Sequence, residues 1–381
     1  MDLGFIAGAY RGEGPYVTAY LQSRRVAEDA ALQVGLRWQA LAQQLRQAGA
    51  DGAAVAAVQE TILPRRPGAV TAQGRAVVAG ADGVLLDRPL RTAPPPGVPE
   101  LAADDARWAP LPHLLPLLGY EQQPVPHLLV VANRVGADIH VIVDGKEDVT
   151  VVDGADSPLH KPQGQGWSHR RIQQRAENQW EHNAGLVANA VSRLATRHRA
   201  SLVLLAGDVR ARAAIAEAAP TGVRKMIVET EHGSRAAGAA DAPLREEAAR
   251  LAAEHTQQAH TRLMDRFVTE RGHAERAAEG VEKVIEAVRA GGVDTLLLDP
   301  AAHLDPGIGR PEVWVGHGGT DLAVTKTELE RLGVEEYAAD RADAALIRAC
   351  VATGARLELL RNGDPTVTDG VAAVLRYPLP D

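Results

Sequence analysis

The sequence contains a single cysteine, Cys350, so neither an internal disulfide nor a cysteine-based zinc site is possible. Aromatic residues make up only 3% of the chain. No apolar run reaches the ~18 residues that a membrane helix needs. The most apolar stretch, 125–143, is interrupted by Asn133, Arg134 and Asp138. Since the first residues show neither a basic start nor a long apolar run, we expect no secretory signal, no membrane contact and a cytoplasmic location.

What the sequence does contain is typical of a globular protein: 45% of the residues are hydrophobic and 24% are charged. At roughly 150 residues per domain, a chain of 381 residues predicts two to three domains. The net charge of −8 argues against a protein that coats nucleic acid over its whole surface. A local basic patch remains compatible with that charge.

The first segment, residues 1–122, is expected to be an N-terminal α/β domain. Strand formers alternate at 16–21, and apolar residues recur every three to four positions over 24–48, which predicts a strand and then a long amphipathic helix. A second, short helix is expected after Asp51-Gly52. Strands at 74–80 and 83–86 are joined by the turn Asp82-Gly83. The proline-rich stretch 92–100 is a linker or surface loop.

The second segment, residues 123–271, is expected to be a middle domain. Strands are predicted at 127–131, 138–143 and 149–152, and a long helix at 168–198. A buried strand at 201–207, a short helix, a strand at 224–228 and a second long helix at 243–271 follow. Strands that alternate with helices predict an α/β layer with parallel strand pairs.

The third segment, residues 272–381, is expected to be a C-terminal α/β domain. A helix is predicted at 277–290, ending at Gly291-Gly292, followed by a strand at 294–299. A glycine-rich region at 307–319, a helix at 339–353 and a strand at 357–360 complete it. Cys350 falls among apolar residues of that helix and is expected to be a core residue.

The stretch from residue 160 to residue 171 is the most informative for function. It places glycines, a tryptophan and several cations between a predicted strand and a long helix. Glycines give a loop reach, cations follow a phosphate backbone, and an indole stacks on an unpaired base. An ordinary solvated loop, with its tryptophan folded back on its own domain, is the alternative. The candidate RNA-contacting residues are Lys161, Gly164, Gln165, Gly166, Trp167, Ser168, His169, Arg170, Arg171 and Arg175.

Other patterns are weaker. Gly316-His317-Gly318-Gly319-Thr320 lacks the ending of a P-loop and favours a plain loop over a phosphate-binding nest. Asp153 and Asp156 are expected to cap a turn rather than act as a carboxylate pair. No Gly-x-Ser-x-Gly elbow is present. His255 and His260 are off the spacing that directs two ligands at one metal. We therefore predict no catalytic residue, no metal and no cofactor from the residue chemistry.

Several motifs resemble archaeal and eukaryotic class-1 release factors and Pelota. Residues 161–178, a glycine loop running into a basic helix, resemble the release-factor middle domain, in which a Lys-x-x-x-Gly-Gly-Gln-Ser loop precedes a similar helix. Residues 202–207 resemble its next strand. Residues 279–284, 293–297 and 370–377 resemble the C-terminal domain of the same factors. The resemblance covers roughly residues 125–381 and implies three α/β domains: a mixed-sheet N-terminal domain, an RNase H-like middle domain and a C-terminal domain similar to kink-turn-binding ribosomal proteins.

The N-terminal segment has no Asn-Ile-Lys-Ser codon-reading motif and resembles the bacterial branch of the family. In that branch, residues 15–21, 74–86 and 160–162 resemble actinobacterial members; the branch also includes the ribosome hibernation factor Balon. The resemblance implies that the chain fills the A site of the 70S ribosome and contacts ribosomal RNA. It also implies joint binding with elongation factor Tu or another translational GTPase. Away from the ribosome we expect a monomer.

The sequence departs from the release factors at the position of their hydrolytic glutamine. Where they have Gly-Gly-Gln-Ser, this chain has Gln165-Gly166-Trp167-Ser168. An indole carries one N–H donor and no acceptor, so it cannot replace an amide. We therefore expect a hibernation or rescue factor that is not an enzyme. The alternatives are a peptidyl-tRNA hydrolase that uses Gln165 or the Ser168/His169 pair, and a stress-associated protein-binding module on a release-factor fold.

Overall fold

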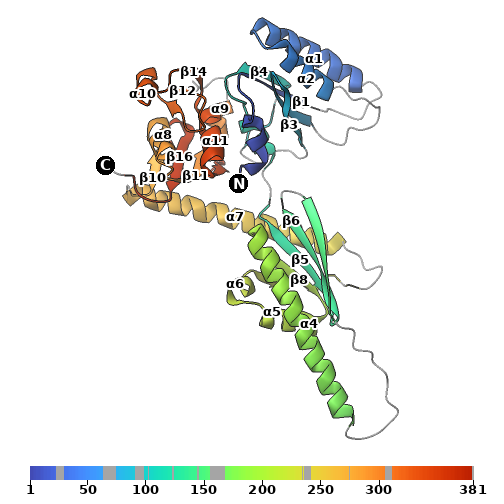
Figure 1. Cartoon of the computed structure of the whole chain (residues 1–381). Coiled ribbons are helices and arrows are strands. Elements are labelled where there is room, and N and C mark those ends of the chain that lie inside the picture. The colour runs from blue at the N-terminus through green and yellow to red at the C-terminus, as the bar shows by residue number, and fades with distance from the viewer. Residues whose placement is uncertain are drawn as a thin grey trace. The chain divides into compact units, whose positions relative to one another are not determined.

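The structure is a computed structural model that describes residues 1–22, 30–62, 74–90, 98–101, 103–121, 124–143, 146–154, 168–233, 235, 242–273, 275–304 and 311–379, with the backbone alone at 30–33 and 168–176. The chain forms two compact units (Figure 1). Residues 1–122 and 263–381 form the first unit, and residues 123–262 form the middle unit. The division into three domains at residues 122 and 271 stays a prediction.

The N-terminal part of the first unit is built on a four-stranded sheet. It contains η1 (Gly4–Tyr10), β1 (Tyr16–Gln22), α1 (Ala30–Gln47), α2 (Gly52–Ile62), β2 (Gly74–Gly80), β3 (Gly83–Leu90), β4 (Asp105–Ala109) and α3 (Leu115–Tyr120). The strand order is β3-β2-β1-β4, and all three strand pairings are antiparallel. The expected mixed sheet is therefore wrong in this detail. The predicted Asp82-Gly83 turn joins β2 and β3 as a tight hairpin, which fixes that pair as antiparallel.

The C-terminal part of the first unit holds two further sheets. Its elements are β10 (Ala277–Glu279), α8 (Val281–Arg289), β11 (Val293–Leu298), α9 (Pro300–Leu304), β12 (Glu312–Val315), β13 (Leu322–Ala323), α10 (Lys326–Arg331), β14 (Ala338–Arg341), α11 (Ala342–Thr353), β15 (Arg356–Leu359), η2 (Thr368–Gly370) and β16 (Val371–Leu375). One sheet has the order β10-β16-β11-β15, with β11 and β15 parallel. The other has the order β13-β12-β14 and is antiparallel.

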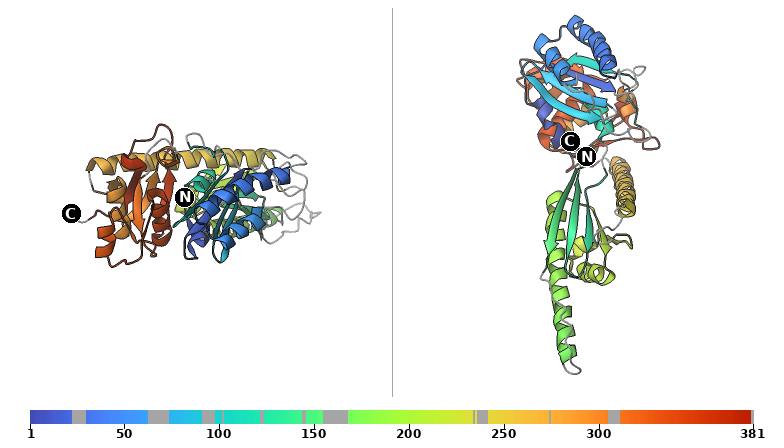
Figure 2. Two further views of the ribbon diagram at one scale, coloured as in Figure 1. Left: turned by 90° about the horizontal axis from the view of Figure 1, so that it is seen from above. Right: turned by 90° about the vertical axis from the view of Figure 1, so that its right-hand side faces the viewer.

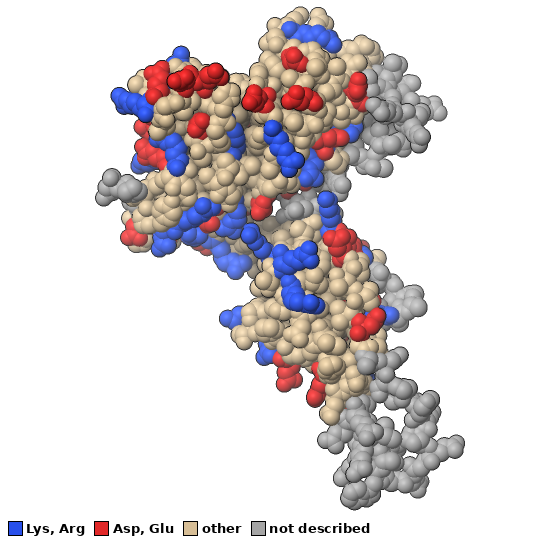
Figure 3. Space-filling view, viewed as in Figure 1, with Lys and Arg blue, Asp and Glu red and all other residues tan. Residues whose placement is uncertain are grey.

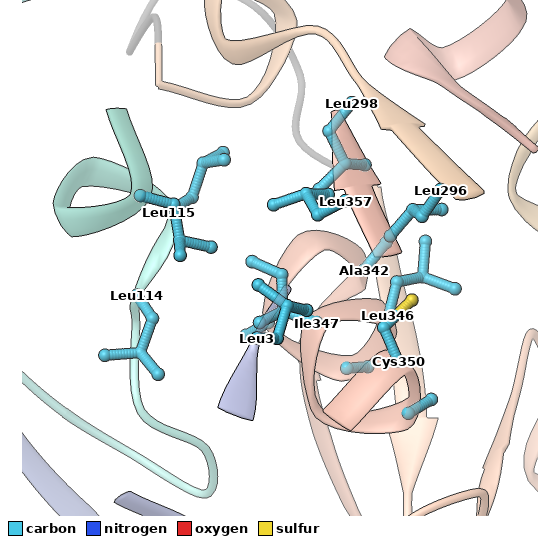
Figure 4. Packing of buried hydrophobic residues seen from close by; sticks show 14 of the residues in the cluster. Leu3, Leu114, Leu115, Leu296, Leu298, Ala342, Leu346, Ile347, Cys350 and Leu357 are labelled. Atoms are coloured by element: carbon cyan, nitrogen blue, oxygen red, sulfur yellow. The ribbon is translucent and has the colours of Figure 1, made fainter. Parts of the chain in front are cut away.

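One hydrophobic cluster joins the two parts of the first unit. Leu114, which precedes α3, and Leu115, its first residue, pack in the same cluster as Leu346 of α11 and Leu296 of β11 (Figure 4). Cys350 lies in this cluster and is fully buried, which confirms its prediction as a core residue. Burial raises the pKa of its thiol to about 12. The thiol therefore stays protonated and acts as a small apolar group.

The middle unit is a five-stranded sheet with helices on both faces. Its elements are β5 (His127–Ala132), β6 (Gly136–Val143), β7 (Lys146–Asp153), α4 (Ser168–His198), β8 (Leu202–Gly207), α5 (Val209–Ala218), α6 (Thr221–Arg224), β9 (Ile227–Glu229) and the first part of α7 (Ala242–His273). The order is β7-β6-β5-β8-β9, with β6 antiparallel to its neighbours and the other pairs parallel. This is the strand order of the predicted RNase H-like fold.

Each face of the sheet is covered by one long helix (Figure 2). Val187 and Val191 of α4 pack with Ile139 and Val141 of β6 on one face. Leu244 and Ala248 of α7, with Leu129 and Val131 of β5, bury the other face. Within the part of the chain that the structure describes, no helix is long and apolar enough to cross a bilayer.

Four of the predicted elements need correction. Gly280, at φ 85°, ends β10 and delays the helix predicted from residue 277 until Val281. The helix predicted from residue 339 begins at Ala342, because residues 338–341 pair with β12. Residues 221–224 are helical, and the strand predicted from 224 starts at Ile227. The region 307–319, predicted only as glycine-rich, contains the strand β12.

Candidate nucleic-acid interface of the middle unit

The predicted RNA-contacting residues fall mostly outside the part of the chain that the structure describes. Residues 155–167, which include Lys161, Gly164, Gln165, Gly166 and Trp167, are not described. Ser168, His169, Arg170, Arg171 and Arg175 lie in the first turns of α4, where the structure describes the backbone alone. The grouping of these side chains therefore stays a prediction. The parts of the unit that hold the two ends of this segment are described.

The helix α4 begins where the candidate segment ends. Its 31 residues give it a length of about 46 Å at a rise of 1.5 Å per residue. Ala184, Val187 and Val191 bury one face of its second half against the sheet. The N-terminal part extends past the end of the sheet (Figure 1). Because a helix is stiff, the packing of the second half of α4 on the sheet sets the direction in which its first turns extend.

Asn183 of α4 holds Gly154, the residue that precedes segment 155–167. Its side chain is 3% exposed, and its Nδ2 donates to the backbone oxygen of Arg134 at 3.1 Å. Gly154, the residue after β7, packs directly against this amide. A Cβ on Gly154 would lie 2.2 Å from Asn183 Oδ1, so only glycine fits there. The Gly154 N–H donates to the oxygen of Val135 at 2.7 Å. The start of the segment is thereby bound to both α4 and the turn between β5 and β6.

That turn also presents an arginine. Asn133 Oδ1 accepts hydrogen bonds from the N–H groups of Val135 and Gly136, both at 2.9 Å, which shapes the turn. The Arg134 guanidinium then lies over the Trp180 ring, 4.5 Å from its centroid. Cation–π contact of this kind favours a fixed arginine over a freely moving one.

Asp208 connects Arg134 to the start of α5. Its Oδ2 is 3.5 Å from Arg134 Nε, and its Oδ1 accepts from the N–H groups of Arg210 and Ala211 at 3.0 Å as the helix cap. Partial burial opposes ionisation of this carboxyl, but the capping N–H groups and the Arg134 charge together lower its pKa. Asp208 is therefore an anion at neutral pH and holds Arg134 by charge.

A cavity of about 150 Å³ lies between α4 and α5 beneath this arginine. Its lining combines the cations Arg134 and Arg210 with Glu177, Glu181 and the half-buried Trp180 ring. The lining therefore offers charges of both signs and an aromatic surface to a bound molecule.

A second group of cations lies at the opposite end of α4. Arg193 and Arg197, in the last turns of α4, are exposed. Figure 3 shows Lys and Arg side chains gathered over the part of the middle unit that faces the viewer. The middle unit thus carries local positive charge on a chain whose net charge is −8. Charge of this kind is what a phosphate backbone attracts.

Ion pairs hold the edge strand β7 from which the segment departs. Arg235 Nη2 lies 2.9 Å from Asp138 and 2.8 Å from Asp153. At the other end of the strand, Arg245 Nη1 lies 2.7 Å from Glu147 Oε2, and His140 also contacts this carboxylate. These partners, Arg245 first, lower the pKa of Glu147 to about 2. Asp153 was expected to cap a turn, and this is wrong: it ends a strand and pairs with Arg235. Asp156 lies outside the described residues.

The loop from Gly316 to Thr320 follows β12 and leads to β13. The N–H of Gly318 donates to Asp321 Oδ2 at 2.7 Å. A Cβ on Gly318 would lie 2.5 Å from the same oxygen. The carboxylate of Asp321 therefore occupies the position that a phosphate would take in a nest. The plain-loop interpretation is the one that these contacts favour.

The sequence alone did not identify Gly154, Arg134 or Asn183 as parts of this region. One signal was present: Asn183 is a polar residue within the apolar stripe that includes Ala184 and Val187. A buried asparagine in such a stripe requires a partner. Nothing local indicates that the partner is a turn about 50 residues earlier in the sequence.

Comparison with known proteins identifies the middle part of the chain. Residues 126–273 match the model of bacterial archaeo-eukaryotic release factor family 2. Over these residues the chain is similar to the bacterial archaeo-eukaryotic release factors. The match includes the candidate segment, α4, the sheet and α7, so the resemblance stated from the sequence motifs is confirmed.

Two curated relatives align along almost the whole chain. They are the uncharacterized proteins Rv2629 and MT2704 of two Mycobacterium tuberculosis strains, each 27% identical over 370 residues, which is 96% of this chain and 94% of theirs. Among solved structures, ribosome-bound archaeal Pelota with ABCE1 is 11% identical, with 99% of this chain and 95% of that chain covered and a TM-score of 0.38. Saccharomyces cerevisiae Dom34 is 12% identical, with 67% and 64% covered and a TM-score of 0.35.

Proposed function

We propose that the chain is a translation factor that binds the ribosomal A site of idle or stalled 70S ribosomes without releasing the peptide. The family match over residues 126–273 carries this proposal, together with the sequence Gln165-Gly166-Trp167-Ser168 at the position of the release-factor Gly-Gly-Gln-Ser. The family assignment favours the ribosome as the partner. The replaced glutamine argues against the hydrolytic step.

The chemistry at position 167 separates binding from release. Hydrolysis of the peptidyl-tRNA ester in this family depends on an amide that positions water and the leaving group. The Trp167 indole offers a single N–H donor and a large π-face. It suits stacking on an exposed base, worth about 1–3 kcal/mol per base. Gln165 lies two positions earlier and requires a different path of the loop to replace the family's amide.

The described part of the middle unit supports the role of a rigid mount. Asn183 binds the Arg134 carbonyl and packs on Gly154, and the sheet holds the second half of α4. Gly154, which precedes segment 155–167, is therefore held against α4, the helix that follows the segment. Arg134, Arg193 and Arg197 add exposed or half-exposed cations for phosphate contacts. The proposed RNA-contacting set is that predicted from the sequence, with Lys161, Trp167, His169, Arg170 and Arg171 at its centre.

A translational GTPase, elongation factor Tu or another of that class, is the proposed partner on the ribosome, as the resemblance to the release factors implies. The proposed hibernation and rescue roles share the same A-site contact and differ in the state of the ribosome that is bound. The two alternatives are a peptidyl-tRNA hydrolase and a stress-associated protein-binding module. The net charge of −8 favours the second of them.

Replacement of the two arginines at the start of α4 tests the loop assignment. Arg170→Ala with Arg171→Ala should weaken ribosome binding and reduce the slope of log K against log salt, because about two phosphate contacts are lost. The matched control, Arg46→Ala with Arg331→Ala, removes two exposed helix arginines from the first unit and should leave binding nearly unchanged. Equal effects of the two double variants would remove the loop from the interface.

A release assay separates the proposal from the hydrolase alternative. Purified ribosomes that carry peptidyl-tRNA are mixed with the wild-type chain or with the Gln165→Ala variant. The proposal predicts no release above background from either protein. Release by the wild type that is lost in Gln165→Ala would establish the enzyme instead.

A further inference from the structure

A cavity of about 470 Å³ lies within the first unit, where the loop from η1 to β1 meets β14, α11 and the end of β12. Its wall includes the rings of Tyr10, Tyr16, Tyr337 and His317 and the guanidinium-bearing side chain of Arg348. Pockets of about 300–1,000 Å³ with a mainly apolar wall and a few polar groups are typical of small-molecule sites. The volume exceeds what an inorganic ion needs.

Arg348 brings a buried positive charge to this cavity. The residue is 7% exposed. Its Nη1 donates to the oxygen of Gly316 at 2.7 Å and its Nη2 to that of Asp321 at 3.1 Å, while its Nε has no hydrogen-bond partner among the described residues. No carboxylate of the described residues lies within ion-pair distance of it; those of Asp321 and Asp340 act on its charge from farther away. A buried charge without a direct ion pair is costly.

Tyr10 supplies a second buried donor at the same cavity. Its hydroxyl is buried and has no hydrogen-bond partner in the part of the chain that the structure describes. Burial raises the pKa of Tyr10 far above its usual value, so the group remains a neutral O–H donor. The hydroxyl of Tyr16, by contrast, already donates to the oxygen of Gly12. Two donors from distant parts of the sequence, Tyr10 and Arg348, thus lack an acceptor among the described residues.

We propose that this cavity binds a small ring-bearing molecule through one phosphate or carboxylate group, which accepts hydrogen bonds from Arg348 and Tyr10 and neutralises the arginine. The tyrosine and histidine rings of the wall contact the ring of the ligand. The nearby glycine loop does not take part as a phosphate nest, because the Asp321 carboxylate occupies the Gly318 N–H. This site is separate from the proposed ribosome contact of the middle unit.

The mouth of the cavity favours a ligand of low charge. Glu13 and Glu336 both line it and are exposed. Glu336 Oε2 lies 3.1 Å from His317 Nε2 and partly offsets that imidazole, and Glu13 has no ion pair among the described residues. Two acids at the entrance repel a triphosphate more strongly than a monophosphate or a monocarboxylate. We therefore expect singly phosphorylated or monocarboxylate ligands.

Calorimetric titration of the full chain tests the proposal with four probes. GMP and AMP carry a ring and a phosphate, indole-3-carboxylate carries a ring and a carboxylate, and guanosine lacks the oxyanion. Saturable binding of GMP, AMP or indole-3-carboxylate at millimolar concentration or below, with none by guanosine, is the expected result. Comparison of the phosphate and carboxylate probes identifies the oxyanion. Failure of all three anions to bind would overturn the proposal.

Variants assign the binding to this cavity. Tyr10→Phe removes only the hydroxyl. It should lower the affinity for the bound probe about five- to tenfold, because one hydrogen bond to an anion is lost. Arg348→Met should abolish binding, although it also removes the bonds to Gly316 and Asp321. Tyr377→Phe is the matched control, because its hydroxyl bonds Ala290 on an exposed surface. Unchanged affinity in Tyr10→Phe, or equal weakening in Tyr377→Phe, would contradict the assignment.

Discussion

The side-chain amide of Asn183 donates to the backbone oxygen of Arg134 across 3.1 Å, although 49 positions separate the two residues in the sequence. This bond connects the middle of α4 to the turn between β5 and β6. Since Gly154 packs against the same amide, the residue that precedes segment 155–167 is held to α4 by this side chain. The entry to the proposed RNA-contacting segment therefore depends on a single buried asparagine and its surroundings.

Replacement of this asparagine should weaken the middle unit. Asn183→Leu leaves the oxygen of Arg134 without its donor in a buried place, which costs about 1–3 kcal/mol of unfolding free energy. Urea unfolding followed by circular dichroism measures the loss. Asn178→Leu, at an exposed position of the same helix, is the control and should change stability by less than about 0.5 kcal/mol. Equal losses in the two variants would show that the Asn183–Arg134 bond contributes nothing.

Two glycines of the middle unit should respond in opposite directions to alanine. Gly154→Ala places a Cβ 2.2 Å from Asn183 Oδ1, so the amide must move and the fixation of the loop is lost. We expect lower stability together with weaker ribosome binding. Gly185→Ala lies in α4 with nothing within 4 Å of the added Cβ, and should stabilise the helix by up to about 1 kcal/mol. Thermal unfolding and co-sedimentation of both variants measure these effects. A tolerated Gly154→Ala would contradict the described packing.

Asp340 should give the first unit a pH-dependent stability. The residue is 8% exposed, and burial raises its pKa to about 6, with Asp343 adding to the effect and Arg341 and the N–H groups of Arg341 and Leu111 opposing it. The folded state therefore binds more protons than the unfolded state between pH ~4 and ~6, so stability falls as pH rises through this range and levels off above it. The rise of the Asp340 pKa from 3.8 to about 6 corresponds to about 3 kcal/mol of unfolding free energy.

Asp340→Asn isolates this effect because an amide does not titrate. The stability of the variant relative to wild type should improve from pH ~4 to pH ~7 by an amount of the order of 3 kcal/mol. Its amide oxygen can still accept from the Leu111 N–H, which donates to Asp340 at 2.7 Å. Unfolding free energies at several pH values provide the measurement, with the low-pH point as the internal reference. If the difference in unfolding free energy between the two proteins does not change with pH, burial does not raise the pKa of Asp340.

Periodicity predicted the long helices well and the junctions between elements badly. The apolar stripe at 168–198 corresponds to α4 residue for residue, because half of that helix packs on a sheet. The stretches 277–290 and 339–353 were predicted as single helices. In the structure, each begins with a few residues that pair as a strand. Such pairing is decided by distant strands, β16 and β12, and short-range patterns do not contain it.

The local sequence likewise predicted one part of the candidate site and missed another. The composition of residues 160–171 and their resemblance to the release factors identified the loop, since glycines, cations and a tryptophan carry information locally. The contacts that hold the loop involve Asn183, Arg134 and Gly154, which come together only through the sheet. The cavity around Arg348 is lined by residues from both the N-terminal and the C-terminal part of the first unit, and no local sequence pattern predicts such a meeting.

Co-sedimentation with purified 70S ribosomes across a salt series tests the central proposal most directly. The measurement compares vacant ribosomes with ribosomes whose A site is filled by tRNA, each with and without elongation factor Tu. We predict saturable binding to vacant ribosomes that weakens with salt and is lost when the A site is filled. Binding that persists with A-site tRNA, or no binding at low salt with or without the GTPase, would contradict it.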